Sequence, residues 1–150
     1  MKAKNILLLF FIISFLAGCN EYEEGPDISF RTVKQRLCGE WIVERLTVDG
    51  ADSLLDFMNH PGYREYYVFT TDKGNSAPMS GYNSGYTDRL AGSWSLNYNE
   101  EFISFGNANP YGPVFNSYIN WKIIRLSNKE MWFETTFINY KNYEIRFKAK

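Results

Sequence analysis

Alternation of apolar and polar positions is clearest in residues 118–150. Near the chain end, apolar Tyr143, Ile145 and Phe147 alternate with charged Glu144, Arg146 and Lys148. A period of two is typical of a β-strand that buries one face. Polar turns at 127–129 and 141–142 divide the region, which therefore predicts three strands. Around the first turn, we expect one shared face made by Ile124, Leu126, Met131 and Phe133.

Strand patterns also occur earlier in the chain. Residues 37–50 predict a first strand that ends at the turn dipeptide Asp49-Gly50. Residues 64–75 predict a strand followed by a turn. Residues 89–97 and 98–106 predict a hairpin across Asn99-Glu100.

Two segments between these strands have other patterns. Residues 51–63 carry Leu54, Leu55 and Met58 at helical spacing, with Ser53 as a candidate N-cap, and predict one or two helical turns. Residues 76–88 are rich in Gly, Ser and Asn and predict at most a short edge strand. Residues 107–117 contain two prolines and a glycine and predict a loop.

These elements together predict an all-β fold of seven or eight strands with a short helix after the first strand. Sequential strands joined by tight turns favour an up-and-down meander over a parallel arrangement. Closing the meander into a barrel removes the unpaired strand edges. We therefore expect an eight-stranded up-and-down barrel over residues 37–150.

The first residues of the chain have the pattern of a secretory signal. Lys2 and Lys4 are followed by an apolar run from Ile6 to Gly18 that only Ser14 interrupts. This run is shorter than the roughly 20 residues that a membrane-spanning helix needs. A charged start, a short apolar run and small residues before a cut site are typical of an exported protein.

The signal ends in Leu16-Ala17-Gly18-Cys19, which resembles the lipobox of bacterial lipoproteins. The resemblance implies that residues 1–19 are a lipoprotein signal and that Cys19 is lipidated and becomes the mature N-terminus. Several buried acyl chains hold a protein firmly on a membrane. Residues 20–36 are expected to be a flexible acidic tether. The acidic residues after Cys19 resemble surface-export signals of Bacteroidetes lipoproteins, and Asn20 is not the Asp of inner-membrane retention. The expected location is the outer membrane, on its periplasmic face or at the cell surface.

The charge of the mature chain argues against nucleic acid as a partner. Loss of Lys2 and Lys4 lowers the 16 basic residues to 14, against 17 acidic residues, so the net charge is −3. A nucleic-acid-binding domain would show a basic face. Cys38 is the one cysteine left beside the lipidated Cys19, and we interpret it as a small apolar residue rather than a nucleophile.

Gly39-x-Trp41 at the start of the first strand resembles the opening motif of the lipocalins. The strand layout, with segments at 92–96 and 123–133, is similar to the lipocalin-like domains of Bacteroidetes lipoproteins. The resemblance implies that Trp41 closes one barrel end and that a basic residue of the last strand lies over it. Arg146 is the candidate. If Ile145 and Phe147 point inward, Arg146 points outward, and Lys148 is the substitute candidate.

Motifs for catalysis, metal binding and cofactor binding are not found in the sequence. The single histidine, His60, precedes Pro61-Gly62, and we interpret it as a loop residue. No Cys/His cluster, phosphate-binding glycine loop or Gly-x-Ser-x-Gly elbow occurs. We therefore expect a protein that is not an enzyme and carries no metal or cofactor; a hydrolase of envelope material is the weakest hypothesis.

Aromatic residues are abundant and gather in two loop regions. Rings with polar tips suit recognition of a small amphiphile or a sugar. The candidate ligand-binding residues are Tyr82, Tyr86, Tyr111, Phe115, Tyr118 and Trp121. One hypothesis is a lipid-anchored protein that binds a small hydrophobic, amphiphilic or glycan-like ligand in the barrel mouth. The alternative is an envelope lipoprotein that takes no small ligand and contacts another envelope protein or a glycan; it predicts an exposed aromatic patch of Tyr82, Tyr86 and Tyr111. A purely structural interpretation is that the six aromatic residues fill the barrel core or cover the loop bases.

Overall fold

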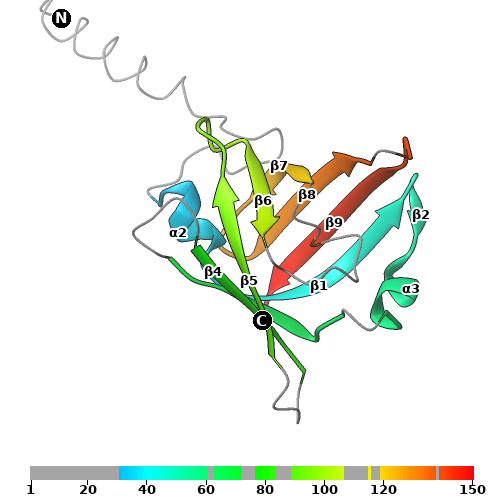
Figure 1. Cartoon of the computed structure of the whole chain (residues 1–150), viewed down its shortest axis with the longest axis horizontal. Coiled ribbons are helices and arrows are strands. Elements are labelled where there is room, and N and C mark those ends of the chain that lie inside the picture. Colours follow the sequence, from blue (N-terminus) through cyan, green and yellow to red (C-terminus); the bar gives the residue numbers. More distant parts are fainter. Residues whose placement is uncertain are drawn as a thin grey trace, which may run out of the picture.

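The computed structural model describes residues 31–60, 63–71, 77–83, 89–106, 115, 119–137 and 139–150. Figure 1 shows a closed β-barrel with a short helix at each of two opposite ends. The helices are α2 (Val33–Leu37) and α3 (Leu54–Met58). The strands are β1 (Gly39–Val48), β2 (Ala51–Asp52), β3 (Tyr66–Phe69), β4 (Ala77–Tyr82), β5 (Arg89–Leu96), β6 (Phe102–Gly106), β7 (Asn120–Leu126), β8 (Glu130–Thr136) and β9 (Asn142–Ala149).

Eight of the strands form an up-and-down barrel, as the sequence predicts. The order is β1-β3-β4-β5-β6-β7-β8-β9, and β9 pairs with β1 to close the sheet. Strand β2 is an extra two-residue strand beside β1, after a turn in which Asp49 and Gly50 both have positive φ. Asp-Gly is a preferred sequence for such a two-residue hairpin turn. Closure satisfies the backbone groups that an open sheet would leave at its edges.

Alternation in the last strand is confirmed. Ile145 and Phe147 are fully buried, whereas Lys148 is exposed. The shared face expected around the turn at 127–129 is wrong at one of its four positions, Ile124. A β-bulge lies between Ile123 and Arg125, so Ile123 is buried in place of Ile124. A bulge adds one residue to a strand and reverses the faces beyond it.

Strand β4 lies inside the sheet, where the sequence predicted a short edge strand. It pairs with β3 on one side and with β5 on the other. Its Gly81 meets a close neighbour, because a Cβ at this position would lie 2.7 Å from Cγ of Arg64. The glycine that weakens the strand signal is therefore required by packing.

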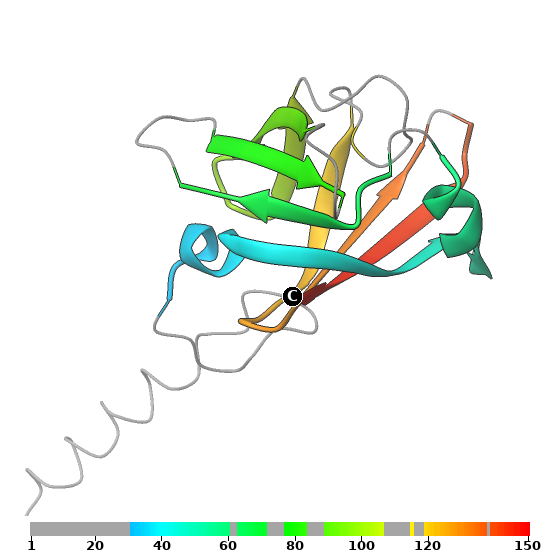
Figure 2. The same cartoon turned by 90° about the horizontal axis from the view of Figure 1, so that it is seen from below.

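Helix α2 corrects the expected boundary of the tether. Residues 33–36, expected to be flexible, belong to a helix that begins with a capping box between Thr32 and Gln35. Val33 and Leu37 are 1% and 0% exposed. The guanidinium of Arg36 donates to the carbonyl oxygen of Leu126 on β7 at 3.0 Å. The helix is therefore part of the domain and covers one barrel end (Figure 2).

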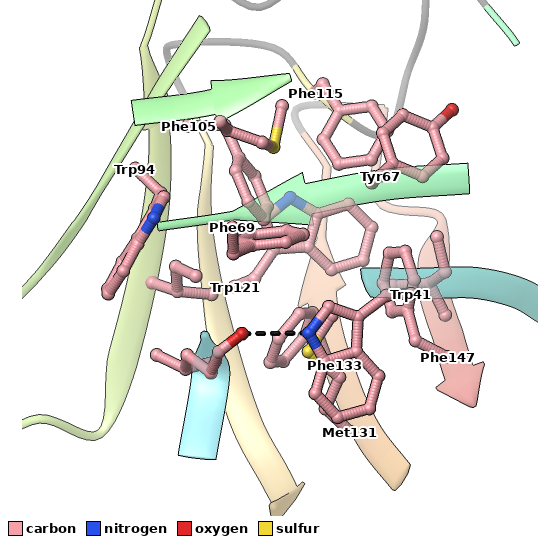
Figure 3. Packing of buried hydrophobic residues seen from close by; sticks show 14 of the residues in the cluster. Trp41, Tyr67, Phe69, Trp94, Phe105, Phe115, Trp121, Met131, Phe133 and Phe147 are labelled. Carbon is pink, nitrogen blue, oxygen red and sulfur yellow. Dashed lines mark hydrogen bonds between the residues drawn. The ribbon is translucent and has the colours of Figure 1, made fainter. Parts of the chain in front are cut away.

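Aromatic side chains from all around the barrel fill its interior, as Figure 3 shows. Phe105 and Phe133 have ring centroids 6.4 Å apart, and Phe133 and Phe147 are 5.8 Å apart. Fully buried side chains include Trp41, Trp94, Trp121, Tyr67, Phe69, Phe105, Phe133, Phe147, Leu37, Met79, Ile103 and Leu126. Close packing of such residues supplies most of the stabilising free energy of a small domain.

Candidate functional site

The end covered by α2 is closed by Trp41. Its indole Nε1 donates to the carbonyl oxygen of Leu37 at 2.8 Å, and 2% of the residue is exposed. Gly39 has φ 155°, a backbone conformation that favours glycine. Gly39 and Trp41 therefore shape this barrel end.

The expected contact between Arg146 and Trp41 is wrong. The guanidinium of Arg146 lies 3.9 Å from the ring centroid of Trp132, on the outer face of the barrel, and pairs with Glu144. Lys148, the substitute, pairs with Glu44 at 3.5 Å on the same face. Strand alternation decides this outcome, because the inward Ile145 and Phe147 turn both basic residues outward.

The candidate ligand-binding aromatic residues do not gather at a barrel mouth in the described part of the chain. Trp121 and Phe115 are 0% and 3% exposed and belong to the core. Tyr82 stacks on Tyr66 with ring centroids 5.2 Å apart, and the ammonium of Lys150 lies over the Tyr66 ring. Tyr86, Tyr111 and Tyr118 lie outside the described residues.

An open cavity of about 450 Å³ lies at the other end of the barrel, beside α3. Its lining comes from β1, the β1–β2 turn, α3 and the start of β9. The lining residues are Leu46, Val48, Asp49, Ala51, Ser53, Asp56, Phe57, His60, Lys141 and Tyr143. A volume of this size is typical of small-molecule sites. We refer to this space as the mouth cavity.

Helix α3 lies beside the mouth cavity, and residues at its start and in its middle hold it in place. Oδ1 of Asp52 accepts a hydrogen bond from the backbone N–H of Leu54 at 2.9 Å. Ser53 occupies the expected N-cap position, but its side chain makes no capping bond. Phe57 belongs to the buried core, is 4% exposed and packs edge-on against Tyr63. The short helix therefore has one anchored apolar side chain.

His60 reaches the mouth cavity through a turn that follows α3. Its backbone N–H donates to the carbonyl oxygen of Phe57 at 3.0 Å, and its own carbonyl oxygen accepts from the N–H of Tyr63 at 2.9 Å. The rim across from it is fixed as well. Asp49 and Asn142 exchange two hydrogen bonds, at 2.7 and 2.9 Å. Both walls of the cavity are therefore held by hydrogen bonds.

The chemistry of the mouth cavity is amphipathic. Leu46 and Phe57 are buried and provide an apolar floor. The rim carries the carboxylate of Asp56, the imidazole of His60 and the ammonium of Lys141. An apolar floor with a few polar groups above it is the usual design of a ligand pocket.

The described residues offer neither a reactive cysteine nor a cluster of metal ligands. Burial raises the pKa of the Cys38 thiol, so little of it is thiolate at neutral pH. Within the described ranges, no three His, Cys, Asp or Glu side chains gather where a metal ion would be held. The same part of the chain contains no helix of sufficient length and apolarity to span a membrane.

Tyr67 is a buried polar residue of the core. Its hydroxyl accepts a hydrogen bond from the backbone N–H of Arg64 at 3.0 Å. Burial raises the pKa of Tyr67 far above its ordinary value of about 10. The hydrogen bond from the backbone N–H of Arg64 opposes this rise in pKa. Two charge effects are smaller still: Tyr63 raises the pKa and the Arg64 guanidinium lowers it. The protein therefore holds this hydroxyl in its neutral form.

Replacing Tyr67 with phenylalanine is expected to lower the free energy of unfolding at pH 7 by about 1–3 kcal/mol, because the buried N–H loses its acceptor. The wild type should also lose stability as the pH rises above about 10, since the unfolded tyrosine ionises first. Urea titrations from pH 7 to about 11.5 should show a steeper loss above pH 10 in the wild type than in the variant. Parallel curves would contradict the buried, neutral hydroxyl.

The mouth cavity leaves only a partial signal in the sequence. The pattern of residues 51–63 predicts the helix, whereas His60 carries no signal beyond its place in a loop. Lys141 and Tyr143 come from the far end of the chain, and only the barrel register brings Tyr143 opposite Val48. Comparison of the chain with protein-family models and with curated proteins gave no match.

Proposed function

We propose that this protein is a non-enzymatic, lipid-anchored binding protein of the bacterial outer membrane, and that it holds a small amphiphilic ligand in the mouth cavity. The observation that carries the proposal is the amphipathic lining of this cavity beneath α3. Leu46 and Phe57 offer an apolar floor, and His60 and Lys141 offer polar groups above it. A ligand with a short apolar body and a neutral polar head fits these groups, because Asp49 and Asp56 line the cavity as well as Lys141.

The packed interior limits the size of this ligand. Phe105, Phe133 and Phe147 occupy the space that a deep ligand would need, and each is at most 1% exposed. A ligand is therefore held in the outer part of the barrel. This favours a compact amphiphile over a long acyl chain, because a long chain would have to displace buried rings at high free-energy cost.

The proposed anchor fits this orientation of the barrel. The described chain begins at Arg31, directly before α2, and α3 lies at the opposite end of the barrel (Figure 2). An anchor at Cys19 would join the domain at its α2 end. The mouth cavity would then open at the end remote from the attachment point, where a ligand has access from solvent.

Filling the mouth cavity is expected to abolish ligand retention. Ala51 is exposed and lines the cavity, so Ala51→Trp places a ring there without disturbing the core. Native mass spectrometry of residues 20–150, paired with an organic extract, should show a bound small molecule in the wild type. Its occupancy should fall by about tenfold or more in the variant.

The matched control is Ala91→Trp, because Ala91 is an exposed alanine of β5 that does not line the cavity. It should retain the ligand at wild-type occupancy. A bare polypeptide mass for the wild type, with an empty extract, would contradict the proposal. So would equal loss of ligand in both variants.

A second function, contact with another envelope protein, is favoured by one observation. Leu55 and Met58 on α3 are 70% and 46% exposed, although both are apolar. Their spacing of three residues places them on one side of the helix, where they could form the apolar centre of a protein contact. In this case the extract would be empty, and Leu55→Ser with Met58→Ser would release one defined partner from a pull-down.

A further inference from the structure

A second concave site lies on the outer wall of the barrel, next to the mouth cavity, with which it shares Tyr143. It is an open groove of about 400 Å³. We refer to it as the outer groove. Its lining residues are Thr47, Gly50, Phe102, Asn120, Lys122, Glu134, Thr135, Thr136, Asn142, Tyr143 and Glu144. Most of these residues have polar side chains, whereas buried Leu46 and Phe57 form the floor of the mouth cavity.

The barrel register places this lining in one row across five strands. Phe102 is opposite Lys122, and Lys122 is opposite Glu134. Glu134 is opposite Glu144, and Glu144 is opposite Thr47. Directly opposed side chains on one face lie within contact distance of each other. The row therefore presents a continuous polar strip with one aromatic ring at its end.

Each carboxylate of the outer groove is paired with a basic side chain. Lys122 pairs with Glu134 at 3.4 Å, and Arg146 pairs with Glu144. Arg146 is itself held against Trp132 by a cation–π contact at 3.9 Å, which fixes the position of the Glu144 carboxylate. An anion would meet two carboxylates here. A cation would have to displace two existing ion pairs.

Hydrogen-bonding groups of both kinds line the outer groove. The amide oxygen of Asn142 accepts from Thr136 at 2.8 Å, and that of Asn120 accepts from Ser104 at 2.6 Å. These bonds use only the oxygen of each amide, so the N–H donors make no hydrogen bond within the described residues. The carboxylates of Glu134 and Glu144 supply further acceptor positions.

We infer that the outer groove binds a neutral glycan. Each sugar hydroxyl both donates and accepts, which matches the interleaved amides and carboxylates. The apolar face of a sugar ring matches the half-buried ring of Phe102. The volume equals that of roughly thirteen water molecules at about 30 Å³ each, enough for a short oligosaccharide segment. This inference does not depend on a ligand in the mouth cavity.

The test is a titration of the full chain in detergent with oligosaccharides. Amide chemical shifts in nuclear magnetic resonance spectra report binding. The probes are maltohexaose, cellohexaose, xylohexaose and mannohexaose, with polygalacturonate as a charged comparison. We expect at least one neutral probe to shift amides at 120–122, 134–136 and 142–144. Thr136→Trp, which fills the groove from an exposed strand position, should weaken that binding by about tenfold or more.

The matched control is Thr71→Trp, an exposed threonine outside the groove, which should bind within about twofold of the wild type. Three results would overturn the inference. The first is no shift with any neutral probe at about 5 mM. The second is binding of polygalacturonate alone. The third is a set of shifts centred on Phe57 and His60, which would place glycan binding in the mouth cavity instead.

Discussion

Replacing Trp41 with alanine lowers the free energy of unfolding by about 3–5 kcal/mol. The indole is 2% exposed, and its removal leaves a cavity at the barrel end that α2 covers. The variant also loses the hydrogen bond from Nε1 to the carbonyl oxygen of Leu37. Urea unfolding followed by circular dichroism measures the change as a lower midpoint at an unchanged slope.

A second tryptophan provides the control for this prediction. Trp132 lies on the outer face between the guanidinium groups of Arg125 and Arg146. Trp132→Ala should cost about 1–2 kcal/mol, since it removes cation–π contacts and little buried volume. Equal losses for the two variants would contradict the assignment of Trp41 to the closed barrel end and of Arg146 to the outer wall.

Replacing Leu37 with alanine is expected to lower the free energy of unfolding by about 2–5 kcal/mol. Leu37 is fully buried although it belongs to a five-residue helix at the start of the domain. Such a short helix has little stability of its own, so it persists through this packing. The measurement is the same urea titration.

Lys34→Ala on the exposed side of α2 is the matched control and should change the free energy by less than about 0.5 kcal/mol. A similarly small effect of Leu37→Ala would mean that α2 does not contribute to folding. The domain would then begin at β1, and residues 33–36 would belong to the tether, as the sequence predicts.

Much of the barrel was predictable because its strands follow simple rules. Alternation placed Ile145 and Phe147 inward, and Asp49-Gly50 marked a hairpin turn that the structure contains. The hairpin across Asn99-Glu100 joins β5 and β6 as expected. Each of these features depends on neighbouring residues alone, so the sequence contains the full signal.

The errors arose where distant contacts override local patterns. The bulge between Ile123 and Arg125 shifts the inward face by one residue, and nothing in the surrounding apolar run marks it. Gly81 weakens the strand signal of β4 because it must leave room for Arg64. Helix α2 is too short for periodicity to show, and burial of Val33 and Leu37 is what defines it.

The candidate site was less predictable than the fold. The density of aromatic residues suggested a ligand site, yet Phe115 and Trp121 fill the core, as the alternative interpretation of these residues stated. The cavity residues that matter come from separate segments. His60 follows α3, and Lys141 precedes β9, so only the closed barrel brings them to one mouth.

The most direct test of the central claim is a crystal structure of the protein purified from the cells that produce it. The account predicts electron density for a small molecule under α3, bounded by Leu46, Phe57 and Tyr143. The rings of Phe105 and Phe133 should keep the interior closed. An empty mouth cavity, or a ligand lying among these two rings, would contradict it.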